Sequence, residues 1–87
     1  MQLDYIVITK HDHGFAVVIV PQPILSNTTA AQQMCAFFER QYFHIPTVLM
    51  ARDKRGIPSS YYGPGDLAIQ LLNTPLETAP WQQVRLS

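Results

Sequence analysis

The sequence predicts an α+β domain, with a mainly antiparallel sheet and two helices packed on one face. Three observations lead to this prediction. Residues 3–10 and 15–20 are rich in β-branched and aromatic side chains, residues 29–44 repeat apolar side chains with a helical period, and residues 45–63 have the pattern of a β-hairpin. The predicted order is ββαββα(β), in a single small domain of residues 1–87.

The first two strands are joined by a short loop, in which Gly14 is free to adopt a positive φ angle. Neither strand alternates between apolar and polar residues, and a continuous apolar run is typical of a strand covered on both faces. Two helices cover only one face. We therefore expect a partner, or a curled sheet, to cover the other. Pro21 and Pro23 end the second strand, because proline cannot donate to the sheet.

A long helix follows. Thr29 with Gln32 fits a capping box at its start, and the other possible N-caps are Ser26, Asn27 and Thr28. Phe37 and Phe43 widen its apolar side. The helix should end before Pro46, because the residue preceding a proline is disfavoured in the helical region. Its central apolar stripe, at the spacing i, i+3, i+4, i+7 and i+11, consists of Ala31, Met34, Cys35, Phe38 and Tyr42.

The hairpin at 45–63 has an apolar first strand, a charged tip ending in Gly56 and a second strand ending in aromatic residues. A glycine-rich turn then leads to Asp66, a suitable N-cap for a shorter helix that ends near Asn73. Residues 81–86 alternate loosely, which indicates a final edge strand or an ordered tail.

The composition favours association with another protein or with a second copy. Only 14% of the residues are charged, against about 25% in an average soluble domain, and the formal net charge is zero. Net charge near zero promotes association. We expect no membrane partner and a cytoplasmic protein, because no signal-peptide pattern and no apolar run long enough to span a bilayer occur.

The pattern of chemically active residues predicts no catalytic, cofactor-binding or metal site. His11 and His13 could bind a metal with His44, but no recognisable ligand spacing supports this, and a polar loop is the favoured interpretation. Cys35 lies within an apolar stripe, where cysteine behaves as a small core residue. The carboxylates are scattered, and Gly-x-Ser-x-Gly does not occur. A small enzyme or metal protein stays open as an alternative.

Arg52, Lys54 and Arg55 form a basic cluster at the hairpin tip, with Tyr61 and Tyr62 available to stack on bases. This cluster makes nucleic-acid binding a second alternative. Against it, Asp53 interrupts the cluster and the chain is neutral overall, whereas nucleic-acid-binding domains usually carry a basic excess.

From 45 to 72 the chain has Ile-Pro-Thr, an apolar strand, a charged turn with glycine, a second strand, glycine and a short helix. This order resembles the second half of a thioredoxin. The resemblance covers about a third of the chain and implies that Pro46 is the counterpart of the cis-proline facing the active site in that family. The chain lacks Cys-x-x-Cys, so the resemblance implies a thioredoxin-like protein without redox activity.

The favoured hypothesis is a non-catalytic interaction module that self-associates, or docks on a protein partner, through an apolar sheet face or edge. It requires no cofactor. The continuous apolar strands, the low charge and the lack of a catalytic pattern support it. Aromatic residues are enriched at interface hot spots. The expected contact residues are Tyr5, Val18, Tyr61, Tyr62 and Trp81.

Overall fold

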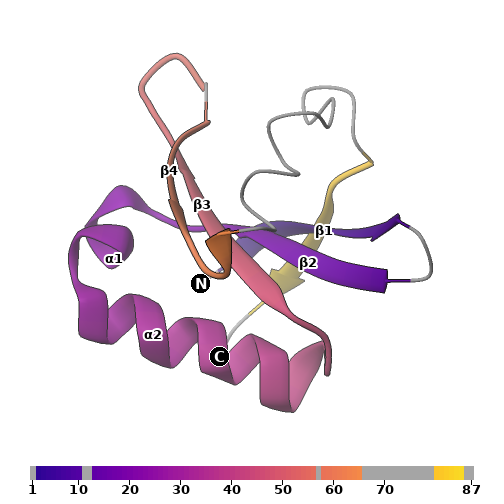
Figure 1. Cartoon of the computed structure of the whole chain (residues 1–87). Helices are drawn as coiled ribbons and strands as arrows, with labels where there is room; N and C mark the ends of the chain where they lie inside the picture. The colour runs from indigo at the N-terminus through magenta and orange to yellow at the C-terminus, as the bar shows by residue number, and fades with distance from the viewer. Residues whose placement is uncertain (1, 11–12, 57, 66–79, 86–87) are drawn as a thin grey trace.

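The computed structural model describes residues 2–10, 13–56, 58–65 and 80–85. They form a five-stranded sheet with the order β4-β3-β2-β1-β5 (Figure 1). The strands are β1 (Gln2–Lys10), β2 (His13–Ile19), β3 (Thr47–Arg52), β4 (Pro58–Tyr62) and β5 (Gln82–Arg85). Of their four pairings only β2–β3 is parallel, so the predicted α+β class with a mainly antiparallel sheet is confirmed.

Both predicted hairpins are present. In the first, β1 and β2 pair antiparallel from Asp4 opposite Ile19 to Lys10 opposite His13, close to the predicted bounds. In the second, β3 and β4 pair antiparallel on either side of the charged tip. The final segment, β5, pairs antiparallel with the start of β1 and is an edge strand of the sheet.

The chain passes from β2 to β3 through helices α1 (Gln22–Ser26) and α2 (Thr28–Phe37) and a π-helical segment, η1 (Phe38–Tyr42). Both helices lie on the same face of the sheet (Figure 1). The sequence analysis did not predict α1. Its first turn contains Pro23, which is tolerated there because the first helical N–H groups have no partner within the helix. The second predicted helix, beginning at Asp66, lies outside the described residues.

Asn27 caps α2. It has an extended backbone between the two helices, and its side chain accepts a hydrogen bond of 3.1 Å from the N–H of Ala30. The predicted capping box of Thr29 and Gln32 is therefore wrong, because the helix begins at Thr28 and both residues already lie within it. The short α1 places Asn27 at the junction where an N-cap is needed.

The π-helical segment changes which side chains face the core. The N–H of Phe43 donates a hydrogen bond of 2.7 Å to the carbonyl of Phe38, five residues earlier. In an α-helix Tyr42 would follow Phe38 on the same face; the wider turn brings Phe43 there instead. Phe43 stacks on Phe38 at 5.5 Å between ring centroids. Tyr42 is 44% exposed, so its predicted place in the apolar stripe is wrong, whereas Ala31, Cys35 and Phe38 are buried as predicted.

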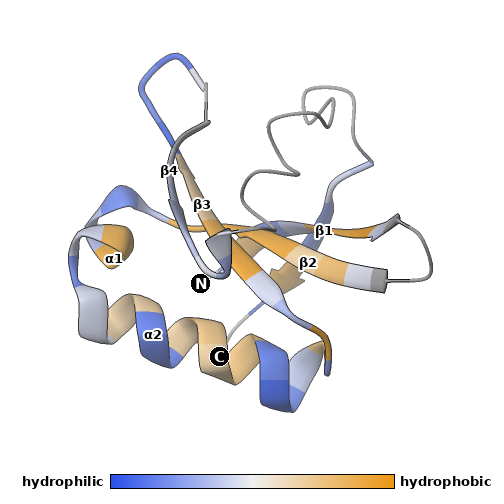
Figure 2. Ribbon diagram, viewed as in Figure 1, coloured by the Kyte–Doolittle hydropathy of each residue, from blue (hydrophilic) through white to orange (hydrophobic). Residues whose placement is uncertain are grey.

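Apolar side chains fill both faces of the sheet. Figure 2 shows hydrophobic residues along much of β2 and β3. Between the sheet and the helices lie Leu3, Val18, Val20, Ala31, Cys35, Phe38, Leu49 and Val84. On the opposite face lie Ile6, Ile8, Phe15, Val17, Val48 and Met50. The strands of the sheet centre are thus buried on both faces, as their continuous apolar runs predict.

The face opposite the helices does not need a second molecule to cover it. Val17, Val48 and Met50 have no exposed surface within a single chain, and Phe15 retains 2%. Burial of these side chains on both sides is achieved within the chain, so they do not require the partner that the apolar runs led us to expect. Docking on a partner through a sheet face or edge stays a prediction.

Pro46 follows a trans peptide bond, because the described residues contain no cis peptide bond. The expected counterpart of the thioredoxin cis-proline is therefore absent. The turn between η1 and β3 is made instead by His44, which adopts a left-handed backbone conformation with φ of 59°. No helix within the described ranges is long and apolar enough to cross a membrane.

Candidate functional site

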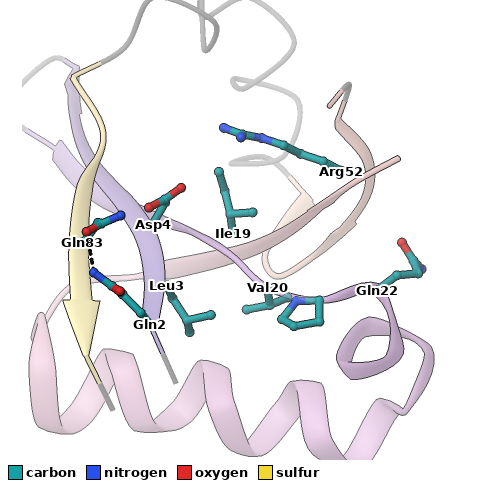
Figure 3. A pocket seen from close by; sticks show the side chains of 9 residues that line it. Gln2, Leu3, Asp4, Ile19, Val20, Gln22, Arg52 and Gln83 are labelled. Carbon is teal, nitrogen blue, oxygen red and sulfur yellow. Dashed lines mark hydrogen bonds between the residues drawn. The ribbon is translucent and has the colours of Figure 1, made fainter. Parts of the chain in front are cut away.

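A cleft of about 430 Å³ opens where the first two strands separate (Figure 3). The chain leaves β2 after Ile19 and turns at Pro21 into α1, whereas β1 extends to Gln2 and Leu3, which pair only with β5. The cleft occupies the resulting fork. Ile19, Leu3 and Val20 supply its apolar surface, and its polar groups come from Gln2, Asp4, Gln22, Arg52 and Gln83.

Asp4 and Arg52 bring opposite charges to this cleft from two different strands. Asp4 pairs with Ile19 across β1 and β2, and Ile19 pairs with Met50 of β3, two residues before Arg52. Side chains two apart in a strand share a face, so all these side chains lie on the face opposite the helices. Figure 3 shows the Arg52 side chain extending from β3 over Ile19, with the Asp4 carboxylate on the other wall. Both residues are described, and no ion pair joins them.

Arg52 is held at this position by an aromatic ring. Its guanidinium carbon lies 5.5 Å from the ring centroid of Trp81, a cation–π distance. On the opposite wall, the side-chain amide of Gln2 donates a hydrogen bond to the side-chain oxygen of Gln83. The cleft therefore has one wall with an oriented guanidinium and another with a carboxylate beside paired amides.

A second surface feature lies along β5, where the half-buried Tyr5 and the exposed Tyr42 lie near the sheet edge. The Tyr5 hydroxyl donates a hydrogen bond of 2.8 Å to the Gln82 side chain. The Tyr5 ring contacts Tyr42 edge-on at 6.3 Å and Phe43 at 5.0 Å. Gln82, Gln83 and Arg85 are exposed along the strand. We call the strand Gln82–Arg85 with Tyr5 and Tyr42 the β5 edge.

The structure does not gather the predicted contact residues into one patch. Val18 has no exposed surface and packs beneath the helices, so its prediction as a contact residue is wrong: it lies at the centre of the sheet. Tyr62 packs on the helix side, while Tyr61 and Trp81 pack on the opposite side; all three are half-buried. Tyr5 belongs to the β5 edge.

The basic hairpin tip is partly neutralised by its own aspartate. A guanidinium nitrogen of Arg55 lies 3.5 Å from the Asp53 carboxylate, and the Arg55 backbone N–H donates to Asp53 Oδ1 at 2.8 Å. Arg52 is turned to Trp81 and the cleft, and Lys54 is exposed in the turn. Arg52 and Arg55 thus each contact another side chain within the chain, and nucleic-acid binding by the three cations stays a prediction.

Cys35 is buried and serves the core, as its place in the sequence indicates. Its thiol donates to the backbone carbonyl of Thr47 at 3.1 Å and lies 3.7 Å from Glu39 Oε1. Burial, together with the nearby Glu39 carboxylate, raises the pKa of this thiol from 9.0 to about 11. A nucleophilic cysteine needs the opposite shift, so this arrangement disfavours nucleophilic chemistry.

Within the part of the chain that the structure describes, no three His, Cys, Asp or Glu side chains are grouped to hold a metal ion. His11 and the side chain of His13 lie outside that part, and His44 is exposed. Metal binding by the three histidines, and enzymatic activity, stay predictions.

The sequence analysis missed both the cleft and the exposed Tyr42. The only local signal for the cleft is Asp4, a lone carboxylate within an otherwise apolar strand. Comparison with known proteins adds no assignment, because no family model, curated protein or solved structure matches the chain.

Proposed function

We propose that this protein is a small non-catalytic module that self-associates by pairing its edge strand β5 with the same strand of a second copy. The observation that supports this proposal best is the unpaired outer side of β5, which no described strand occupies. An unpaired edge presents N–H and C=O groups that can hydrogen-bond to another strand. A cytoplasmic location completes the proposal, since reduced, buried cysteines such as Cys35 are usual there.

The two edges of the sheet differ in how well they are protected. The other edge strand, β4, begins with Pro58, which lacks the N–H that an added strand would use. No proline interrupts β5, and each of its four residues retains an N–H group. Prolines and repeated charges are the usual protection of an edge, and β5 carries only one charge, on Arg85. The β5 edge is thus the better site for strand addition.

The side chains of β5 also suit pairing with an identical strand. In a two-fold antiparallel pair centred on Val84, directly opposed side chains share a face, so Arg85 lies opposite Gln83 of the second copy and no like charges face each other. Such a pair has two-fold symmetry, the commonest symmetry of homo-oligomers. It also places the second copy near Tyr42, which is 44% exposed and contacts Tyr5 behind the edge. A four-residue strand gives a small interface, so we expect a weak dimer.

Sedimentation velocity between roughly 5 and 500 µM protein tests the proposal, because micromolar affinities fall in this range. The wild-type protein should shift from monomer to dimer as its concentration rises. Gln83→Arg should weaken the dimer by opposing two cations, at positions 83 and 85, across the interface. Adding Arg85→Glu to this variant should restore the dimer, because the same positions then carry opposite charges.

These two variants share the loss of the Gln2–Gln83 hydrogen bond, so the comparison between them isolates the charges across the interface. A wild-type protein that stays monomeric over the whole range would overturn the proposal. So would equal dimerisation of the single and double variants, because the β5 strands would then not face each other.

A further inference from the structure

We propose that the cleft between β1 and β2 binds a small zwitterionic molecule of the amino-acid type. Its ammonium group would bind to Asp4 and its carboxylate to Arg52. This site is separate from the outer side of β5 and does not depend on self-association. The argument rests on the charges of the cleft, on the orientation of Arg52 and on the apolar surface between them.

The two charges of the cleft select for a ligand that carries both signs. Asp4 is half-buried, and it forms no ion pair with Arg52 although both line the same space. A simple anion that binds to Arg52 is repelled by Asp4, and a simple cation that binds to Asp4 is repelled by Arg52. A zwitterion of suitable length satisfies both side chains together. Opposite charges that share a cleft without meeting therefore favour a zwitterionic ligand.

Arg52 is oriented before any ligand arrives. Its contact with the Trp81 ring restricts a long side chain that would otherwise lose conformational entropy on binding. A guanidinium group can donate two parallel hydrogen bonds to a carboxylate, which adds geometric selectivity. Arg55 differs, because its guanidinium is already paired with Asp53. Arg52 is therefore the better carboxylate-binding group of the two.

The surface between the charges suits an aliphatic segment. Ile19 lies between the strands that carry Asp4 and Arg52, and Leu3 and Val20 extend the apolar lining. The volume of about 430 Å³ falls within the range of small-molecule sites, roughly 300 to 1,000 Å³. The hydrogen-bonded amides of Gln2 and Gln83 provide further polar groups on the Asp4 side. The cleft can thus hold a ligand with two charged ends and a short carbon chain.

A series of ω-amino acids, from glycine to 6-aminohexanoate, tests the proposal. Amide chemical shifts in ¹⁵N-labelled protein report where each compound binds, and the fluorescence of Trp81, the single tryptophan of the chain, reports changes at Arg52. One chain length should bind best. It should bind about tenfold or more tightly than the alkylammonium ion and the alkanoate with the same number of carbon atoms.

Two near-isosteric variants assign the charged groups. Asp4→Asn and Arg52→Gln should each weaken binding of the best zwitterion about tenfold. Only Arg52→Gln should also abolish weak binding of the alkanoate. Lys54→Gln is the matched control: it removes an exposed cation outside the cleft and should leave binding unchanged. If Asp4→Asn does not fold, Arg52→Gln and the single-charge compounds still decide the question.

Three results would overturn the proposal: no saturable shifts with any member of the series, equal affinity for singly charged analogues, or unchanged binding by Arg52→Gln. Measuring binding at roughly 5 and 500 µM protein separates this inference from the proposed self-association. The affinity for the zwitterion should be the same for the monomer and the dimer, because the charged groups Asp4 and Arg52 come from one chain.

Discussion

The Glu39 carboxylate, on the π-helical segment, accepts a hydrogen bond of 3.0 Å from the backbone N–H of Thr47, the first residue of β3. Thr47 is completely buried, so water is not available to this N–H group. The bond ties the end of the helix to the strand that follows it. It also gives the buried Thr47 N–H an acceptor. A buried N–H without a partner would lower the stability of the fold.

Glu39→Ala should lower the free energy of unfolding by about 1–3 kcal/mol, because it leaves the buried Thr47 N–H without an acceptor. Urea denaturation measures this loss. Glu39→Gln retains an oxygen acceptor and should lose less. Arg40→Ala, at an exposed neighbouring position, is the control and should change stability by no more than about 0.5 kcal/mol. Equal losses for Glu39→Ala and Arg40→Ala would contradict the assigned role.

Cys35 should make the protein less stable as the pH rises from 9 to 11. The pKa of its thiol is about 11 in the folded protein against an ordinary value of 9.0, so in this range the unfolded chain loses a proton that the folded protein keeps. The contribution of this pKa difference to the free energy of unfolding is fully present below pH 9 and is lost as the pH rises to 11. The loss should be at most about 2–3 kcal/mol.

Because lysines and tyrosines also titrate in this range, the test compares urea denaturation of the wild-type protein with that of Cys35→Ala at each pH. The variant should be the less stable of the two at pH 8, since it loses a buried side chain and its hydrogen bond to Thr47. The difference between them should narrow toward pH 11. A difference that stays constant over the range would show that the thiol has no raised pKa.

The π-helical turn predicts different costs for two neighbouring aromatic residues. Phe43 packs against the core and stacks on Phe38, so Phe43→Ala should destabilise the protein by about 2–4 kcal/mol. Tyr42→Ala should cost about 1 kcal/mol or less, because its side chain is 44% exposed and contributes mainly edge contacts. Thermal or urea unfolding of the two variants gives the comparison. In a continuous α-helix Tyr42→Ala would be the more destabilising of the two changes. That result would refute the widened turn.

Much of the secondary structure follows from local patterns. The first hairpin and the strands around the charged tip were predicted because β-branched and apolar runs with intervening turns lie close together in the chain. The long helix was predicted from its apolar period, and its burial at Ala31, Cys35 and Phe38 agrees. Asn27 is one of its predicted N-cap candidates, but the preferred capping box of Thr29 with Gln32 is wrong, because the short α1 that places Asn27 at the junction has no clear apolar period of its own.

The site residues could not be predicted in the same way. Asp4 and Arg52 lie far apart in the sequence and line one cleft only because β1, β2 and β3 are neighbours in the sheet. The prediction of Val18 as a contact residue is wrong because an apolar strand residue has the same sequence signature whether its face is covered or open. The prediction of Tyr42 in the core is wrong for a related reason. The apolar period assumes 3.6 residues per turn, and the wider π-helical turn moves the residues that follow it to a different face of the helix.

The sequence by itself determined the α+β class, the two hairpins and the extent of the long helix, because these depend on interactions between residues close together in the chain. Only the tertiary structure decided the order of the strands, the burial of both sheet faces and the placement of Asp4 and Arg52 on the walls of one cleft. These features depend on pairing between segments that are distant in the sequence. For example, the 4 residues of β5 pair with the first residues of β1. Local periodicity carries no information on such pairing.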